Sequence, residues 1–375
     1  MKAFRSVVRR AAVAAALAAP APLLAQGGVT GFSGVEVRSV SYQAGLGIKS
    51  VSEVAVPIAV MWAASPRLTL DLGGWYASAS RKGDSATSTI SGPTDVQLRG
   101  VYQLVPDLAV LTVAVNLPTG KTKLASDQLL TAGAIASDLI PYPVVNFGTG
   151  FNVTSGLALA VPVSGWALGV AGSYRLNGGF TPFSDTTGSY KAGGEFRVRL
   201  GADRIVGQGR VSLGVTFSTF GEDNYASSPI FQSGKRYIGQ GSWSFPVGKM
   251  GLQVYAWDLY RAAGAQLITS SSVSTQKRNV LAFGAAGSIQ AGRNVLRPQI
   301  EYRLHTIGSS SPTSAGKLLM LGMQYQMSLN DRFMLQPGVR FDTGSENVLD
   351  AAGDPTSQSA TLTGFSVSVM LRARM

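Results

Sequence analysis

Hydrophobic and polar residues alternate strictly along the last part of the chain, between Leu329 and Met375. One segment places Phe333, Leu335, Val339 and Phe341 on one face, and Gln336, Arg340 and Asp342 on the other. The next segment places Phe365, Val367, Val369, Leu371, Ala373 and Met375 opposite Ser366, Ser368, Arg372 and Arg374. A period of two over about ten residues is typical of a β-strand with one apolar and one polar face. This stretch therefore predicts a β-hairpin.

The same alternation recurs along the whole chain, in segments separated by breaks that are alternately short and long. We expect sixteen strands, at residues 34–44, 50–63, 67–80, 93–105, 107–118, 145–163, 166–178, 191–206, 210–219, 235–247, 250–263, 278–291, 294–306, 317–329, 332–343 and 361–374. Short breaks such as Ser164-Gly165 carry turn residues, and the long breaks are polar or rich in Gly and Ser. This is the pattern of an up-and-down outer-membrane barrel with both termini in the periplasm. Fourteen strands remain an alternative if the first pair lies outside the wall.

A soluble β-sandwich would show the same alternation, with its apolar face inside the protein. Charged residues make up only 14% of the chain, yet no stretch after residue 26 approaches the ~18 uninterrupted apolar residues of a spanning helix. In lipid every backbone N–H and C=O must be paired, so a sheet can span a membrane only as a closed barrel. Large apolar residues fill one face of nearly every segment, which favours an all-β, antiparallel transmembrane barrel. Pro57 falls in mid-segment, where we expect a β-bulge.

Residues 1–26 have the pattern of a cleaved secretory signal, with a basic start and a short apolar core from Ala11 to Ala19. Removing the signal lowers the formal net charge from +12 to +8, because it carries four cations and no acid. The remaining cations are spread along the strands, which does not favour a nucleic-acid partner. The chain has no Cys, which excludes disulfides, thiol catalysis and a lipoprotein anchor. We expect residues 27–375 to form one barrel, placed in outer-membrane lipid by the barrel-assembly machinery.

Charged residues occupy the face opposite the apolar one, and a charge facing lipid at mid-membrane costs about 2–4 kcal/mol. We therefore expect them to line the lumen. The expected lining comprises Glu36, Arg38, Asp95, Gln97, Arg99, Glu195, Arg197, Arg199, Asp203, Arg297, Gln299, Glu301, Arg303, His305, Arg340, Asp342, Arg372 and Arg374. Two roles are open: Glu–Arg pairs that cross-link the wall, or a selectivity ladder in which surplus Arg favours anionic or polar solutes.

The longest connection runs from Gly120 to Val144 and holds a candidate helical piece around Leu129, Leu130 and Ala136. A sixteen-stranded barrel is wide enough for an aqueous channel unless something folds into it. This connection could fold inward as a constriction, lie across the mouth as a lid, or remain an ordered outer loop.

The sequence offers little support for catalysis. His305 is the single histidine, and Glu301 on the same strand face would lie about 13 Å away, too far for a hydrogen-bonded acid–base pair. A hydrolase triad would need a serine such as Ser309 to Ser311. No G-x-S-x-G, H-E-x-x-H or P-loop spacing occurs. We therefore expect no enzyme, catalytic residue, metal site or cofactor, and keep a barrel hydrolase and a non-conducting structural barrel as alternatives to a channel.

Four segments carry a family resemblance: Gly92 to Tyr102 (GPTDVQLRGVY), Val115 to Lys121 (VNLPTGK), Asn146 to Gly150 (NFGTG) and Gly169 to Arg175 (GVAGSYR). In these segments the chain resembles the outer-membrane transporter family named after the meta-pathway of phenol degradation. The resemblance implies passive passage of small, often hydrophobic or aromatic molecules, and no catalytic residues. The chain departs from a common barrel pattern by ending in Met375 instead of Phe or Trp.

Overall fold

The computed structural model describes residues 28–43, 47–267, 273–308, 313–350 and 353–375. The expected signal at 1–26 and the serines at 309–311 lie outside the described residues. Within these ranges, no helix is both long enough and apolar enough to cross a membrane.

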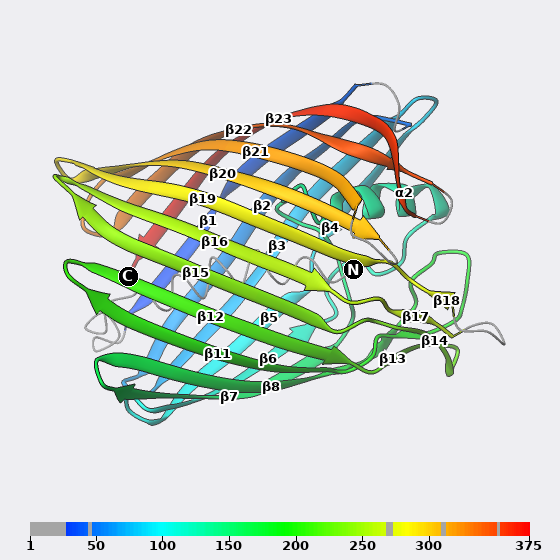
Figure 1. Ribbon diagram of the computed structural model, residues 1–375. Coiled ribbons are helices and arrows are strands. Elements are labelled where there is room, and N and C mark those ends of the chain that lie inside the picture. Colours follow the sequence, from blue (N-terminus) through cyan, green and yellow to red (C-terminus); the bar gives the residue numbers. More distant parts are fainter. Residues whose placement is uncertain (1–27, 44–46, 268–272, 309–312, 351–352) are drawn as a thin grey trace.

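Sixteen antiparallel strands close into a barrel, as the alternation predicts (Figure 1). In wall order they are β1 (Val29–Tyr42), β2 (Ile48–Ser65), β3 (Leu68–Gly83), β5 (Val96–Val105), β6 (Ala109–Leu117), β7 (Asn152–Val163), β8 (Trp166–Asn177), β11 (Glu195–Val206), β12 (Gly209–Phe220), β15 (Arg236–Val247), β16 (Met250–Arg261), β19 (Lys277–Ala291), β20 (Asn294–Gly308), β21 (Thr313–Ser328), β22 (Phe333–Leu349) and β23 (Pro355–Arg374). Each expected strand corresponds to one of these, so the sixteen-strand count is confirmed and the first pair belongs to the wall.

The barrel closes where its last strand meets its first. β23 pairs antiparallel with β1 from Thr30 opposite Arg374 to Tyr42 opposite Leu362. Val29 and Met375 exchange backbone hydrogen bonds of 3.2 and 2.8 Å, so the two ends of the described wall lie together at the short-turn end. The pairing of the final hairpin with the first strand is therefore confirmed.

Two strands differ from the expected segments because the chain leaves the wall at that point. The strand expected at 93–105 begins only at Val96 as β5, and an additional strand, β4 (Thr87–Pro93), forms in the expected break before it; both pair with β3. The strand expected at 145–163 begins only at Asn152. Val145 and Phe147 are buried inside the barrel, so their apolar character serves packing in the lumen and not the lipid-facing wall.

The prediction of a bulge at Pro57 is wrong. Pro57 keeps the regular register opposite Trp75, and the register shifts of that pair lie at its ends. On its other side, the ladder between β1 and β2 resumes in the same register after skipping two residue pairs, 34–57 and 35–56. Pro298 and Pro337 likewise fall in two-pair gaps of the β19–β20 and β21–β22 ladders. A proline has no N–H to donate, and here the ladder omits a bond instead of adding a residue.

The two ends of the barrel differ in length and structure. One end carries the short turns, such as Ser164-Gly165, whose φ angles of 47° and 81° match the twist of a tight hairpin. The other end carries a second sheet of six short strands, β9 (Gly179–Phe180), β10 (Tyr190–Lys191), β13 (Glu222–Tyr225), β14 (Ser228–Gln232), β17 (Ala265–Gln266) and β18 (Val273–Ser274). By the rule for outer-membrane barrels, the first end is periplasmic and the second extracellular.

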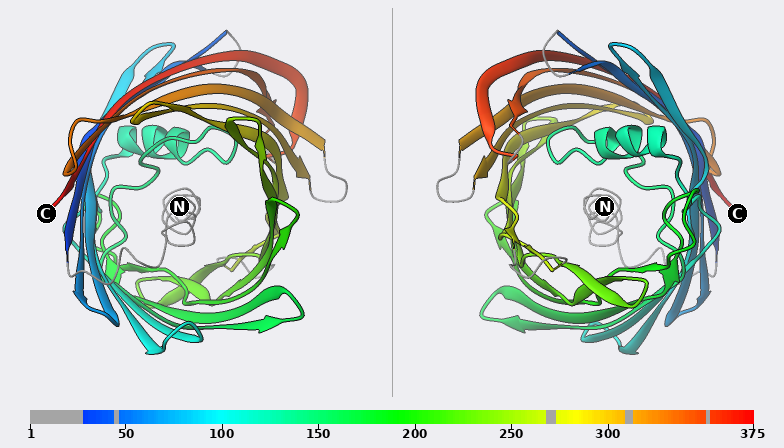
Figure 2. Two further views of the ribbon diagram at one scale, coloured as in Figure 1. Left: turned by 90° about the vertical axis from the view of Figure 1, so that its left-hand side faces the viewer. Right: turned by 90° about the vertical axis from the view of Figure 1, so that its right-hand side faces the viewer.

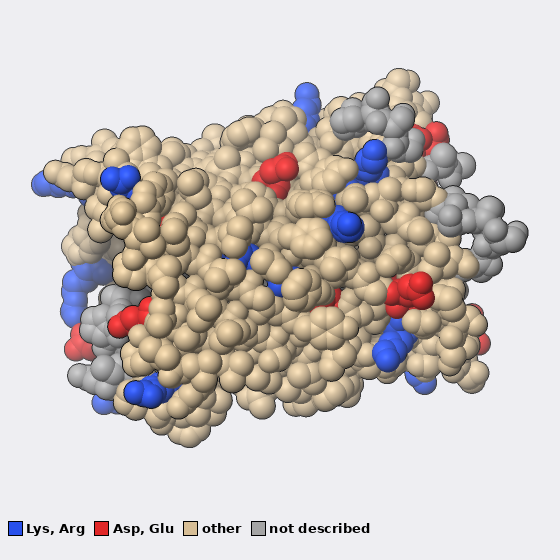
Figure 3. All heavy atoms as spheres, turned by 60° about the horizontal axis from the view of Figure 1, so that its bottom comes forward, with Lys and Arg blue, Asp and Glu red and all other residues tan. Residues whose placement is uncertain are grey.

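The outer face of the wall is apolar. Val37, Ile58, Leu200, Leu213 and Phe365 are each at least 45% exposed, and all point away from the lumen. Figure 3 shows few charged side chains over the side of the barrel and more of them toward its ends. Such a surface is stable against hydrocarbon and not against water, so the wall spans a membrane.

The seam gives a first testable prediction. A Cβ added at Gly34 of β1 would lie 2.3 Å from the backbone oxygen of Val369 and 2.6 Å from the sulfur of Met370. Since a backbone oxygen cannot yield, we expect Gly34→Ala to lower the free energy of unfolding by roughly 1–3 kcal/mol. Gly31→Ala on the same strand is the control, because nothing lies within 4 Å of its added Cβ. Urea unfolding followed by Trp fluorescence measures both, and equal midpoints would contradict the tight seam.

Candidate functional site

The long connection after β6 folds into the barrel. Its helix α2 (Ser126–Ile135) contacts β2, β3 and β4. Viewed along the barrel axis, α2 and the segment after it lie inside the ring of strands, against one side of the wall (Figure 2). We call residues 121–147 the inner loop. Of the arrangements open to it, the structure has the inward fold.

The inner loop is held by an apolar core that it shares with the wall. On the loop, Ile135, Leu139, Ile140, Tyr142 and Val144 are at most 1% exposed. They pack on inward-facing wall residues of the extracellular half, which are Val40, Val51, Ala55, Ala77, Ala79, Ile90, Leu318, Met320 and Leu362. The inner face is therefore not polar throughout, because the part of it that the loop covers is a protein core.

Asp95 holds the two ends of the inner loop together. Its carboxylate accepts hydrogen bonds from the backbone N–H of Gly120 at 3.0 Å and of Thr149 at 2.6 Å. A Cβ on Gly120 would lie 2.1 Å from the backbone oxygen of Phe147, so this approach requires glycine. Asp95 was expected to line the lumen wall, but it lies between β4 and β5 and binds loop backbone.

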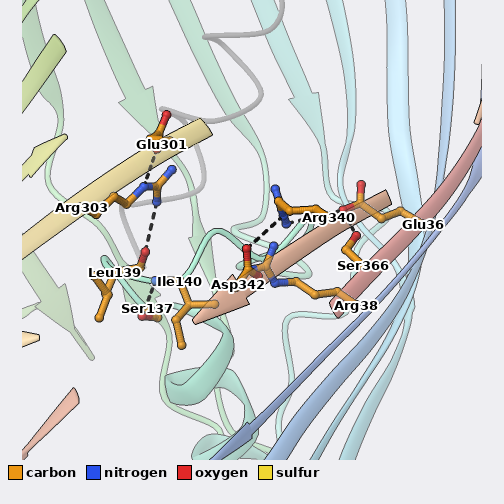
Figure 4. Close-up of polar contacts among 10 residues, drawn as sticks. All are labelled: Glu36, Arg38, Ser137, Leu139, Ile140, Glu301, Arg303, Arg340, Asp342 and Ser366. Atoms are coloured by element: carbon orange, nitrogen blue, oxygen red, sulfur yellow. Dashed lines mark hydrogen bonds and ion pairs between the residues drawn. The ribbon is translucent and has the colours of Figure 1, made fainter. Parts of the chain in front are cut away.

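A cluster of charges at the seam lies beside the inner loop (Figure 4). Arg38 on β1 and Asp342 on β22 form an ion pair of 2.5 Å, and both side chains are fully buried. Arg340 lies 3.5 Å from Asp342 and 3.9 Å from Glu36, whose carboxylate also accepts a hydrogen bond from Ser366 at 3.1 Å. Arg38 also lies 5.5 Å from the ring centre of Tyr142, which connects the cluster to the loop.

Three further polar contacts fasten the inner loop to the wall. The buried carboxylate of Glu53 on β2 accepts a hydrogen bond from the N–H of Val144 at 2.7 Å. Arg303 on β20 donates to the carbonyl oxygen of Leu139 at 3.1 Å and also pairs with Glu301 at 2.7 Å (Figure 4). Asp138 reaches Arg261 on β16 at 2.8 Å. With its core and these contacts, the loop is a fixed constriction and not a loose lid.

The surroundings of His305 do not resemble a catalytic centre. The side chain is 6% exposed, and neither ring nitrogen has a hydrogen-bond partner among the described residues. Glu301, the nearest acid on its strand face, instead bonds Arg303 and the hydroxyl of Tyr255. Within the same residues, no three His, Cys, Asp or Glu side chains are placed to hold a metal ion.

Glu195 and Arg197 lie at the extracellular end of the lumen. Glu195 accepts from Arg197 at 2.5 Å and from Arg236 of β15 at 2.6 Å. Arg199 follows on the same inward face of β11 and is half-buried. The sequence interpretation missed Arg175, Arg236, Arg261 and Arg278, which line the same level of the lumen from neighbouring strands. Each lies at or near the end of its strand and falls on the inward face when the alternation of that strand is extended to its end. This alternation was the signal that could have placed the four arginines in the lumen.

The remaining expected lining residues are spread along the barrel. Arg99 pairs with Asp71 at 2.6 Å, and Asp203 with Arg210 at 3.1 Å. Gln97 and Gln299 bond Asn116 and the hydroxyl of Tyr255, respectively. Arg372 and Arg374 are exposed at the short-turn end of β23, on the face of the strand that points inward. They lie opposite Phe32 and Thr30, so Ser366 and Ser368, and not these arginines, stand beside Arg38 and Glu36.

A cavity of about 930 Å³ occupies the lumen toward the periplasmic end. Its lining mixes polar and apolar residues: the polar ones include Gln253, Arg297, Gln299, Gln324, Arg340 and Ser368, and the apolar ones include Leu252, Pro298 and Met323. The barrel is therefore constricted by the inner loop in its extracellular half and hollow in its periplasmic half.

These features define a class of protein: an outer-membrane β-barrel of the porin-like kind, with a constricting loop folded inside. No protein-family model matches the chain, and no curated protein matches it in sequence. Solved structures with a similar fold include the CymD monoaromatic hydrocarbon channel, 11% identical over 96% of this chain and 92% of that chain, with a TM-score of 0.46. An anion-selective porin from Comamonas acidovorans is 12% identical over 92% and 98%, with a TM-score of 0.41. An outer membrane channel from Pseudomonas putida F1 is 16% identical over 69% and 94%, with a TM-score of 0.39.

Proposed function

We propose that this protein is a passive outer-membrane channel for small polar and anionic solutes. The observation that carries the proposal is the cavity of about 930 Å³ inside a closed, membrane-spanning barrel, with Arg210, Arg297 and Arg340 in its lining. A purely structural barrel needs no such space, and hydrated side chains along a lumen lower the barrier to water and ions. No observation favours the hydrolase alternative.

The choice of solute class follows from what the lumen exposes. Ile140 and Val144 of the inner loop are buried against the wall and unavailable to a passing molecule, whereas Leu129 and Leu130 are 39% and 59% exposed. Arg210, Arg297 and Arg340 line the cavity, with Glu36 as an acid beside them. The resemblance to the phenol meta-pathway family suggests hydrophobic or aromatic solutes, but the excess of arginine over acid in the cavity lining favours polar and anionic ones.

Planar bilayer recordings in a KCl gradient test this function. We expect single-channel steps and a reversal potential on the anion-preferring side. Arg297→Gln should lower the chloride-to-potassium permeability ratio about twofold, because the lumen potential sets the local counter-ion concentration.

Arg293→Gln is the matched control for that measurement. Arg293 lies in a short turn, its side chain 75% exposed beside Asp331, and it does not line the cavity. We expect its permeability ratio to equal that of the unmodified protein. A silent barrel would rule out the channel, and cation preference would rule out the solute class.

A further inference from the structure

Five arginines lie near one level of the inner face at the extracellular end of the barrel. This arginine belt consists of Arg175 (β8), Arg197 (β11), Arg236 (β15), Arg261 (β16) and Arg278 (β19). Arg175 lies opposite Glu195, and Ser218 of β12 stands between Arg197 and Arg236. Every strand from β8 to β19 in wall order thus contributes a polar residue at this level.

The belt places like charges directly beside one another. Arg236 is the cross-strand partner of Arg261, and Arg261 is the partner of Arg278. Like charges at directly opposite positions destabilise a sheet. The arrangement is therefore stable only where anions lie between the guanidinium groups.

Two carboxylates of the described chain fill part of this need. Glu195 bonds Arg197 and Arg236, and Asp138 of the inner loop lies 2.8 Å from Arg261 and 4.0 Å from Arg278. Each carboxylate is thus shared by two arginines. The belt still has more cations than acids around it.

The unsatisfied donors of the belt show where a further anion is needed. The Nε atoms of Arg175, Arg236 and Arg261 are buried and have no hydrogen-bond partner among the residues that the structure describes. Arg175 is 7% exposed and Arg236 is 5% exposed. A buried guanidinium that lacks part of its partners is costly, and a bound anion would remove that cost.

We propose that the arginine belt is a binding site for the carboxylate group of a small organic anion, and that Asp138 competes with this anion for the belt. Planar carboxylates match the donor geometry of arginine, and the two built-in carboxylates already bind in this way. Of these two carboxylates, Asp138 belongs to the inner loop. It occupies the position at Arg261 and Arg278 that the carboxylate of the solute would take. The inference rests on the proposed channel, whose solute it specifies.

The test uses succinate as the probe and its uncharged analogue succinamide as the comparison. Added to the extracellular side in chloride solution, succinate should block the current saturably, and succinamide should not. Arg236→Gln should raise the half-blocking concentration about tenfold or more, because a hydrogen bond between charged groups is lost. Asp138→Asn should lower it several-fold, because the internal competitor is neutralised.

Arg293→Gln is again the control and should leave the block unchanged, because its side chain lies in an exposed turn. Calorimetric titration of succinate into the detergent-solubilised barrel measures the same binding without conduction. Channel steps without succinate block or calorimetric binding would overturn the site and leave the proposed channel standing. Equal block in Arg236→Gln would also overturn it, and equal block in Asp138→Asn would overturn the competition. A silent barrel that still binds succinate would support the site and reject the channel.

Discussion

Removing the inner loop should raise the single-channel conductance several-fold. A sixteen-stranded barrel leaves an aqueous channel unless something fills it, and here α2 and the segment after it narrow the extracellular half of the lumen from one side. The deletion is feasible because the loop ends already meet: the N–H of Asp95 bonds the carbonyl oxygen of Phe147 at 3.1 Å, and the carboxylate of Asp95 bonds Gly120. A short Gly-Ser linker can therefore join Lys121 to Phe147.

Two further variants test whether a change in conductance comes from loss of the inner loop. Replacing the β13–β14 hairpin with the same linker shortens the extracellular sheet without touching the loop core, and we expect conductance near that of the unmodified protein. Leu139→Asp leaves the chain length unchanged but places a charge in a fully buried site, so it should release the loop and also raise the conductance. If neither the deletion nor Leu139→Asp changes the conductance, the loop does not lie on the conduction path.

Replacing Arg38 with methionine should destabilise the barrel strongly, because it removes one charge of a buried ion pair. Arg38 and Asp342 are both fully buried, so the substitution leaves a buried carboxylate without its main partner. Breaking such a pair costs about 3–5 kcal/mol. We expect a value near the lower end, because Arg340 lies 3.5 Å from Asp342 and compensates in part. Urea unfolding followed by Trp fluorescence measures the change.

The double variant Arg38→Met/Asp342→Leu should recover much of this loss, since replacing both members of a buried pair leaves no isolated charge. Arg293→Met breaks the exposed pair with Asp331 and should change the stability little. Equal losses for Arg38→Met and Arg293→Met would show that burial of the seam pair does not matter. A double variant less stable than Arg38→Met would show that the pair is not the source of the effect.

Much of the wall could be predicted from local patterns. Alternation in β23 and in its neighbours requires only a period of two and a rule about which face meets lipid, and both act within a few residues. Turn residues such as Ser164-Gly165 mark the hairpins for the same local reason. The count of strands and the seam therefore followed without knowledge of any long-range contact.

The candidate site could be predicted only in part, because its contacts depend on register between distant strands. Alternation places Arg38 and Asp342 on inner faces, but only the closed barrel brings together two residues 304 positions apart. Asp138 lies in a loop whose sequence does not say which way it folds, and its partner Arg261 is 123 positions away. The arginine belt emerges only when six strands are aligned.

By itself, the sequence determined that this chain forms a sixteen-stranded membrane barrel with an apolar outside and a charged inside. Lipid imposes that outcome on each strand separately, since every backbone group must be paired and every outward side chain must be apolar. The tertiary structure alone decided that the inner loop folds into the lumen and which charges meet there. Val40, Val51 and Leu362 are apolar residues at inward positions, where alternation alone predicts polar ones, and only packing against Leu139 and its neighbours accounts for them.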